Sequence, residues 1–204
     1  MLFYGWSERL TVSAQSAFCS DFSVFPDWKI KGSTLRSKSN FVGETFGASA
    51  GEQFFEWTVE SAKRPILDAD WYRFEVYDAV LHELARRHFG GDLERLQEVG
   101  RHSARHALSE TYSIFAVRKD FVRFLEKMSV LHSRFYNLGR LVLTERGDNY
   151  SEHELRELPG LSEADAHLAL GFYLGSAEVM GLTQARGRFE PRDAHSLFYR
   201  IDWS

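Results

Sequence analysis

The sequence GGDLERLQEVGRHSARHALSETY, residues 90–112, decides the fold. Asp92 is a helix-capping residue, and the apolar positions after it recur every three or four residues, which predicts a helix that runs to about Tyr112. One face of this helix carries a stripe of small residues: Gly100, Ser103, Ala104 and Ala107. Small side chains let another helix approach the backbone closely, and we expect such a helix contact here. The sequence leaves open the alternative of a cavity wall that faces aromatic rings.

The same helix carries two histidines, His102 and His106, whose spacing of four places them on neighbouring turns of one face. A zinc site needs at least one more ligand, and the arginines beside the pair, Arg101 and Arg105, would repel a divalent cation. On a helical wheel His102 lies opposite the stripe of small residues. We therefore expect the pair to lie on a solvated face, and we predict no metal site.

Composition limits the class of protein. The chain has 204 residues, a net charge of −4 and a single cysteine, Cys19. These values favour one continuous domain over residues 1–204, argue against nucleic-acid binding and exclude a cysteine-based zinc cluster within one chain. No apolar run reaches the roughly 18 residues that a membrane span needs, and the start lacks the features of a secretory signal. We therefore expect a cytoplasmic protein.

The first two regions of the chain differ in their periodicity. Residues 1–60 form an N-terminal region with predicted strands and a short helix: strands over 9–14 and 28–32, a helix over 51–64, and an ambiguous stretch over 39–51. Residues 70–138 form a helical region. Its first helix starts at Trp71 after a cap at Asp70 and stops before Gly90 and Gly91, and its last helix covers 117–136.

The third region, residues 139–204, switches to a period of two. It predicts two hairpins, over 140–158 and 182–203, that flank a helix over 162–181. The fold class is therefore α+β, a helical bundle packed on an antiparallel sheet that is formed mainly by the two C-terminal hairpins.

Aromatic residues are unusually frequent, at 15% of the chain. The rings either fill the core, form a dimer interface, or surround a pocket for an apolar or aromatic ligand with tyrosine hydroxyls or His106 as polar anchors. For the pocket, the predicted ligand-binding residues are Trp71, Phe74, Tyr77, Ala104, Phe121, Phe124, Met128 and Phe172.

Catalytic motifs are missing from the sequence. His82 and His88 are six residues apart, so they do not form the H-E-x-x-H motif, and neither a phosphate loop nor G-x-S-x-G is present. An enzyme would need His106, Tyr112 or Asp70 to converge in a cleft as acid–base groups. We predict a non-enzymatic ligand-binding or signalling module, with a protein-interaction adaptor as the alternative and a small enzyme ranked third.

The order of the predicted elements resembles a superfamily that includes the 4-vinyl-reductase-like sensor domains, the heme nitric-oxide-binding domains and the TRAPP vesicle-tethering subunits. More narrowly, the chain resembles an uncharacterised family of paralogues in myxobacteria. The matching pieces, spread over residues 29–203, are KIKGSTLRS, DWYRFEVYDAVL, GGDLERLQEVGRHSARHAL, RFYNLGRLVL, GFYLGSAEVMGL and LFYRIDW. The resemblance implies a helix-and-sheet module, frequently a homodimer, with an apolar cavity that senses a small molecule.

The chain departs from that superfamily in its cofactor motifs. The closing hairpin lacks the cysteines that hold zinc in vinyl-reductase-type sensors, and nothing places Cys19 in the role of the acylated cysteine of TRAPP-type members. The Tyr-x-Ser-x-Arg element that contacts the heme propionates in heme nitric-oxide-binding domains is also missing. We therefore expect no cofactor, and we expect a hydrophobic small molecule and a second copy of the chain as partners.

Overall fold

A computed structural model describes residues 17–19, 21–109, 113–114, 121–137 and 139–204. The strand predicted over residues 9–14 therefore lies outside the described residues. The elements, in chain order, are β1 (Lys29–Lys31), α2 (Gly32–Phe46), α3 (Ala48–Ala62), β2 (Trp71–Arg73), α4 (Phe74–His88), α5 (Leu96–Ser109), α7 (Phe121–Phe135), β3 (Arg140–Arg146), β4 (Tyr150–Arg156), α8 (Glu163–Val179), β5 (Arg186–Asp193) and β6 (Ser196–Asp202). The α+β class is confirmed.

The C-terminal region forms a four-stranded antiparallel sheet in the order β3-β4-β6-β5, so the two predicted hairpins lie side by side. Leu155 of β4 faces Leu197 of β6 where the hairpins join. In chain order α8 connects the two hairpins. Ser162 caps this helix, because its Oγ atom accepts a hydrogen bond from the backbone N–H of Asp165 at 3.0 Å. The predicted hairpin–helix–hairpin arrangement is therefore confirmed.

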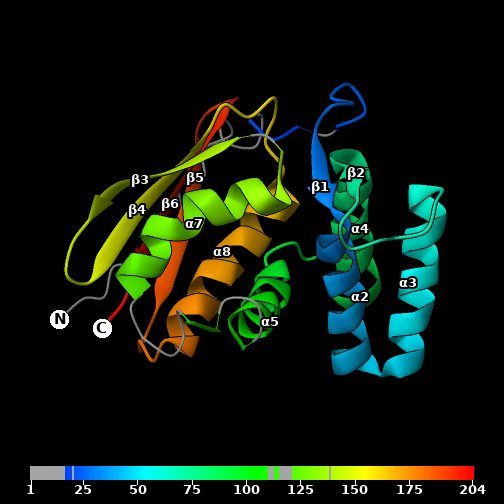
Figure 1. Cartoon of the computed structure of the whole chain (residues 1–204), viewed down its shortest axis with the longest axis horizontal. Helices are drawn as coiled ribbons and strands as arrows, with labels where there is room; N and C mark the ends of the chain where they lie inside the picture. The colour runs from blue at the N-terminus through cyan, green and yellow to red at the C-terminus, as the bar shows by residue number, and fades with distance from the viewer. Residues whose placement is uncertain (1–16, 20, 110–112, 115–120, 138) are drawn as a thin grey trace.

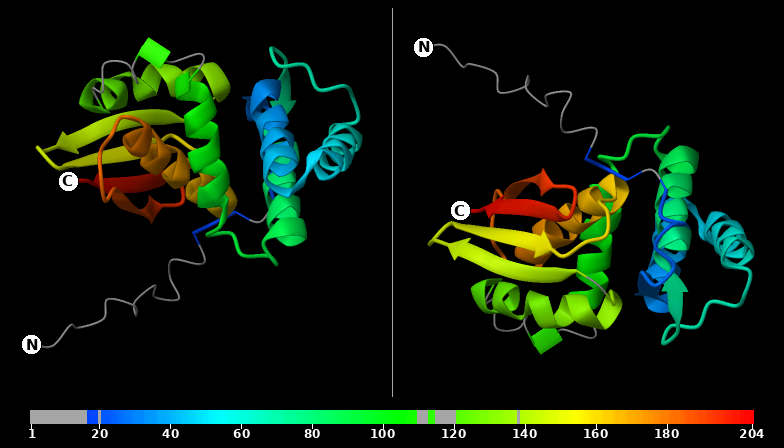
Figure 2. Two further views of the ribbon diagram at one scale, coloured as in Figure 1. Left: turned by 90° about the horizontal axis from the view of Figure 1, so that it is seen from below. Right: turned by 90° about the horizontal axis from the view of Figure 1, so that it is seen from above.

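The elements stack in layers (Figures 1 and 2). The sheet lies at one side, α7 and α8 cover it, α5 crosses beside α8, and α2, α4 and α3 form the far side. A small second sheet pairs β1 with β2, where Ile30 is the register partner of Tyr72. No helix in the described part of the chain is long and apolar enough to cross a membrane. The organisation of residues 1–204 as one domain stays a prediction.

The start of α4 corrects one sequence prediction. The helix begins at Phe74 and not at Trp71, because Trp71–Arg73 pair with β1 as a strand. Asp70 therefore does not cap the helix. Its backbone carbonyl accepts a hydrogen bond from Gly32 N–H at 2.9 Å, and its carboxylate pairs with Arg64 at 3.4 Å.

The ambiguous stretch over residues 39–51 contains the end of α2 and the start of α3. Glycine weakens a helical pattern in sequence, but here Gly51 lets the two helices approach closely. A Cβ atom on Gly51 would lie 2.6 Å from the Cα of Gly43. Gly51, one of the glycines that made the sequence ambiguous, is therefore the residue that allows α3 to pack closely on α2.

The stripe of small residues on α5 packs against α8, which confirms the expected close helix contact. A Cβ atom on Gly100 would lie 2.1 Å from the carbonyl oxygen of Leu168, and a Cβ on Gly171 would lie 2.2 Å from that of Gln97. Both distances are shorter than any van der Waals contact. Because the atoms that each Cβ would meet belong to the backbone of the other helix, rotation of a side chain cannot relieve the clash.

We predict that Gly100→Ala destabilises the protein strongly. The added methyl group must push α5 away from α8, and overpacking of this kind costs about 1–3 kcal/mol or more in the free energy of unfolding. The matched control is Gly43→Ala in α2, where the nearest atom to the new Cβ would be at 3.6 Å. This control should be neutral or stabilised by up to about 1 kcal/mol. Urea unfolding measures both, and equal stabilities of the two variants would contradict the described contact.

Candidate functional site

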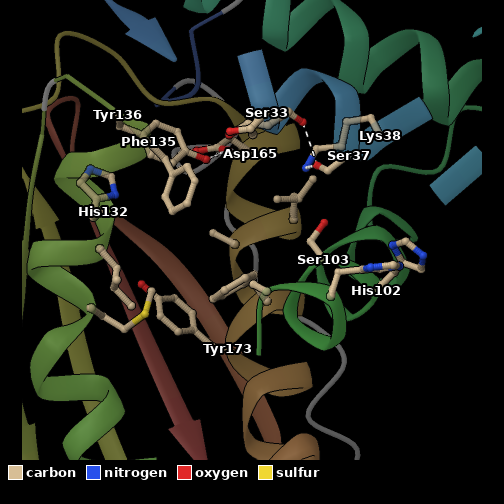
Figure 3. Close-up of a pocket in the computed structure, with 18 of the residues that line it drawn as sticks. Ser33, Ser37, Lys38, His102, Ser103, His132, Phe135, Tyr136, Asp165 and Tyr173 are labelled. Carbon is tan, nitrogen blue, oxygen red and sulfur yellow. Dashed lines mark hydrogen bonds between the residues drawn. The ribbon is translucent and has the colours of Figure 1, made fainter. Parts of the chain in front are cut away.

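A cavity of about 350 Å³ lies where the N-terminal helices meet the sheet-and-helix part of the chain (Figure 3). Helices α2, α5, α7 and α8 contribute to its walls, and β3, β4 and β6 contribute one residue each: Leu141, Leu155 and Tyr199. The α5–α8 contact holds two of these walls together. The cavity is therefore formed by elements that are far apart in the sequence.

Most of the cavity wall is apolar or aromatic. The lining residues of this kind on α7 and α8 are Met128, Leu131, Phe135, Leu168, Ala169, Phe172 and Tyr173. Two of the predicted ligand-binding residues, Met128 and Phe172, are among them. Such a wall suits a ligand with an apolar body.

The other six predicted residues do not line this cavity. Phe74 stacks on Trp28 with ring centroids 3.8 Å apart, and Phe121 meets Trp203 edge-on at 5.2 Å. Trp71 lies under the amino group of Lys31, and Ala104 lies in the α5–α8 contact. The ring centroid of Phe124 is 6.5 Å from that of Phe172. Tyr77 donates a hydrogen bond to Asp165. Helical periodicity identifies buried rings, but it does not tell which of them face a hollow.

Asp165 forms the centre of a polar cluster at one end of the cavity. Its Oδ1 atom accepts hydrogen bonds from the hydroxyl groups of Tyr77, at 2.9 Å, and Tyr136, at 3.0 Å. Burial raises the pKa of the Asp165 carboxyl to about 6, although the two tyrosines and the charge of Lys38 favour its ionised form. Burial also raises the pKa of both tyrosines, which therefore remain hydrogen-bond donors.

Lys38 of α2 is the most unusual residue of the lining. It is only 1% exposed, and its amino group donates a hydrogen bond to Ser37 Oγ at 3.2 Å. No carboxylate among the described residues lies within ion-pair distance of this amino group, and the nearby charge of Asp165 acts over a longer range. Burial lowers the pKa of Lys38 to about 8. Figure 3 shows Lys38 and Asp165 at the same cavity, on different helices.

Three further polar atoms of lining residues are buried without a hydrogen-bond partner among the described residues. They are the hydroxyl groups of Tyr199 on β6 and Ser103 on α5, and the Nδ1 atom of His102 on α5. A buried polar group without a partner is costly, and each of these hydroxyls can donate or accept. Together with Lys38, the two hydroxyls provide polar anchors besides the Asp165 cluster. The sequence predicted tyrosine hydroxyls or His106 as anchors, and His106 does line the cavity, but no local pattern singled out Lys38, Ser103 or Tyr199.

His102 corrects a second sequence prediction, because it is buried and not on a solvated face. Its exposure is 8%, its ring lies edge-on to Phe41 at 5.2 Å, and its Nε2 atom lies 2.9 Å from Glu44 Oε2. The reason is that α2 covers the face of α5 opposite α8. Burial lowers the pKa of His102, and hydrogen bonds from His102 and His106 lower that of Glu44.

His132 of α7 places an imidazole at the cavity wall. Its ring stacks on that of Tyr136, with centroids 4.7 Å apart. Imidazole is a frequent ligand of metal ions, including heme iron. The lining therefore combines an imidazole, an ammonium group and apolar walls.

The two described acid–base candidates of the enzyme hypothesis do not share partners. Asp70 pairs with Arg64, whereas His106 lies 3.1 Å from Glu44 Oε1. The third candidate, Tyr112, lies outside the described residues.

Comparison with known proteins identifies a fold but no family. No family model matches the chain, and no curated protein matches it. Among solved structures, an Fe(II) unliganded H-NOX protein from K. algicida matches with a TM-score of 0.65 and 17% identity, over 86% of this chain and 97% of that one. An H-NOX protein from S. oneidensis in the Fe(II)NO ligation state matches with a TM-score of 0.63 and 13% identity, over 86% and 99%.

The chain therefore has the fold of the H-NOX, or heme nitric-oxide-binding, domains. Of the protein groups that the sequence resembles, the heme nitric-oxide-binding domains are therefore confirmed as similar to this chain in fold. At such low identity the comparison shows the fold alone. The narrower resemblance to a myxobacterial family has no support among these matches and stays a prediction.

We predict that Lys38→Met stabilises the protein near pH 7. The folded-state pKa of about 8 lies below the ordinary 10.5, so the buried ammonium lowers the free energy of unfolding. At about 1.4 kcal/mol for each pKa unit, the change from 10.5 to about 8 corresponds to about 3.5 kcal/mol, so removal of the ammonium should add about 3 kcal/mol near pH 7. The buried ammonium lowers the free energy of unfolding of the parent protein by its full amount below pH 8, and this penalty disappears as the pH rises from 8 toward 10.5. The stability advantage of Lys38→Met over the parent should therefore shrink over this window.

Urea unfolding at about pH 7 and about pH 9.5 measures this effect. The matched control is Lys31→Met, because the Lys31 amino group donates to the carbonyl of Ala69 at 2.6 Å outside the cavity. This control should show no comparable gain. A Lys38→Met protein that is less stable than the parent at both pH values would contradict the prediction, because it would show that the ammonium stabilises the folded protein.

Proposed function

We propose that this chain is a non-enzymatic binding module for an apolar small molecule that carries a carboxylate. The apolar body would lie between α7 and α8, and the carboxylate would meet the amino group of Lys38. The fold that the chain shares with the H-NOX domains supports a role in signalling, as a sensor of this ligand.

The observation that carries this proposal is the buried ammonium of Lys38 beside an apolar cavity. An ammonium group in a medium of low dielectric constant is costly unless an anion pairs with it. Asp165 acts on it only over a longer range and has a raised pKa of its own. A ligand carboxylate would supply the missing short contact, and charge-assisted hydrogen bonds of this kind are among the strongest in proteins.

The size and walls of the cavity support the same class of ligand. Its volume of about 350 Å³ is at the lower end of the range for small-molecule sites. Aromatic side chains from α7, α8 and β6 line it, including Phe135, Phe172 and Tyr199. The unpartnered hydroxyl groups of Tyr199 and Ser103 could bind further polar atoms of the ligand.

Heme is a specific candidate within this class, because it is an apolar ring system with two carboxylates. Two further matching structures come from work on distortion of the heme, and one of them concerns the H-NOX family. The residues of this cavity fit heme in their chemistry: His132 would bind the iron and Lys38 would pair with a propionate. Heme, when bound, supplies an iron with a coordination position for a small gas. The missing Tyr-x-Ser-x-Arg element is the observation against it.

The chemical class is tested by titrating the full chain with decanoate and with its neutral analogue decanamide. Decanoate should bind the parent protein more tightly than decanamide. Lys38→Met should lower the affinity for decanoate by about 10- to 100-fold and leave that for decanamide nearly unchanged, because only the charged contact is lost. Isothermal titration calorimetry measures both, with Lys31→Met as the control that keeps the parent affinities.

Two outcomes would refute the proposed class. The first is a parent protein that binds neither decanoate nor naphthoate, a rigid aromatic carboxylate. The second is a Lys38→Met variant that binds decanoate as tightly as the parent protein does. Because this substitution should not unfold the protein, a loss of binding can be assigned to the contact itself.

Heme is tested separately by adding hemin to the full chain. If heme is the ligand, hemin binding saturates at one per chain with a shifted Soret band, and His132→Gln removes that shift. His82→Gln, on the exposed part of α4, is the control. Decanoate binding without a hemin spectrum would assign the cavity to a ligand without iron.

The remaining expectations concern partners and location. A homodimer, a cytoplasmic location and membership of the myxobacterial family stay predictions. A protein-interaction adaptor is the alternative to be adopted if the cavity binds none of these ligands.

A further inference from the structure

A cluster of potential metal ligands lies where α2 meets α5, at the rim of the cavity. His102 and His106 are one turn apart on α5, with ring centroids 4.6 Å apart. Glu44 of α2 reaches both imidazoles, with Oε2 at 2.9 Å from His102 Nε2 and Oε1 at 3.1 Å from His106 Nε2. One ligand atom from each of the three residues can be chosen so that all lie within 4.8 Å of one another.

We propose that Glu44, His102 and His106 form a binding site for a divalent transition-metal cation such as Zn²⁺. Two imidazoles and one carboxylate are a known three-ligand set for zinc, which leaves a fourth position open for water or another ligand. The cation would connect α2 to α5 beside the cavity. His102 and His106 also line the cavity, so the cation would lie beside the proposed ligand without using Lys38.

The geometry needs only small side-chain movements. Zinc–nitrogen and zinc–oxygen distances of about 2.0–2.2 Å in a tetrahedral site place neighbouring ligand atoms roughly 3.3–3.5 Å apart. The two contacts from Glu44 to the imidazoles are already close to that separation. Glu44 and His106 have about half of their side-chain surface exposed, so they can adjust, whereas His102 is fixed by burial.

The arginines beside the pair do not block a cation at this position. Arg101 lies 3.4 Å from Glu178 of α8, so its guanidinium points to a different helix from the one that carries Glu44. Arg105 is exposed to solvent, where water and salt screen its charge. The carboxylate of Glu44 lies directly between the imidazoles and supplies the negative charge that the α5 sequence lacks.

The position of Glu44, the third ligand, explains why the sequence predicted no metal site. Glu44 is 58 residues from His102 and 62 from His106, in a stretch whose helical character was ambiguous. The carboxylate that follows the pair in sequence, Glu110, lies outside the described residues. Only the packing of α2 on α5 brings an acid to the two imidazoles.

The experiment is a calorimetric titration of the full chain, freed of metal by a chelator, with ZnCl₂. We expect one Zn²⁺ per chain and a rise in melting temperature on binding, because the cation binds the folded state. His106→Gln and Glu44→Gln should each weaken binding by at least about tenfold. Both positions are partly exposed, so these variants should fold, and far-ultraviolet circular dichroism checks this.

Two controls separate this site from other histidines. His82→Gln removes an exposed histidine whose Nε2 lies 3.5 Å from Asp78 and should leave zinc affinity unchanged. MgCl₂ should not bind at comparable affinity, because magnesium prefers oxygen ligands. No zinc uptake by the parent chain, or equal uptake by the parent and the His106→Gln and Glu44→Gln variants, would overturn the proposal. Neither result affects the Lys38 test of the cavity ligand.

Discussion

The structure depends on one close contact between the backbones of α5 and α8. Gly100 and Gly171 each occupy a position where a single methyl group would overlap a main-chain carbonyl of the other helix. This contact fixes the wall of the cavity that carries Ser103 together with the wall that carries Asp165 and Phe172. It also determines which face of α5 remains for α2, and so it places His102 next to Glu44.

The cavity shows a conflict between stability and binding. Lys38 and Asp165 are charged groups in a largely apolar lining, and burial shifts the pKa of each toward its neutral form. Two tyrosine hydroxyl groups support the aspartate, but the ammonium donates its single described hydrogen bond to a serine. An interior designed only for stability would hold a methionine or leucine at position 38. This cost to stability is the observation on which the proposed ligand contact rests.

Sequence patterns predicted the parts of the fold that local chemistry determines. The helix predicted over 162–181 is α8, the two hairpins have the expected limits to within a few residues, and the small residues of α5 mark a helix contact. The patterns failed where tertiary contacts override local preference. Trp71 follows the helical period but pairs with β1, and the boundary between α2 and α3 was obscured by glycines, of which Gly51 is required for the packing of the two helices.

The candidate site was less predictable than the fold for a physical reason. A helical wheel has one apolar face, and α5 is covered on two faces, so His102 was placed in solvent although α2 buries it. Apolar periodicity finds rings that avoid water, but only the packed structure shows that Phe172 faces a hollow and Phe74 faces other rings. The anchors Lys38 and Tyr199 come from elements that lie 161 positions apart in the printed sequence, between residues 38 and 199.

The most direct test of the account is a crystal structure of the full chain grown with saturating decanoate. The account predicts continuous density for the alkyl chain between α7 and α8, with the carboxylate within about 3.2 Å of the amino group of Lys38. Density for the fatty acid only at the surface, or a carboxylate that points away from Lys38, would contradict it.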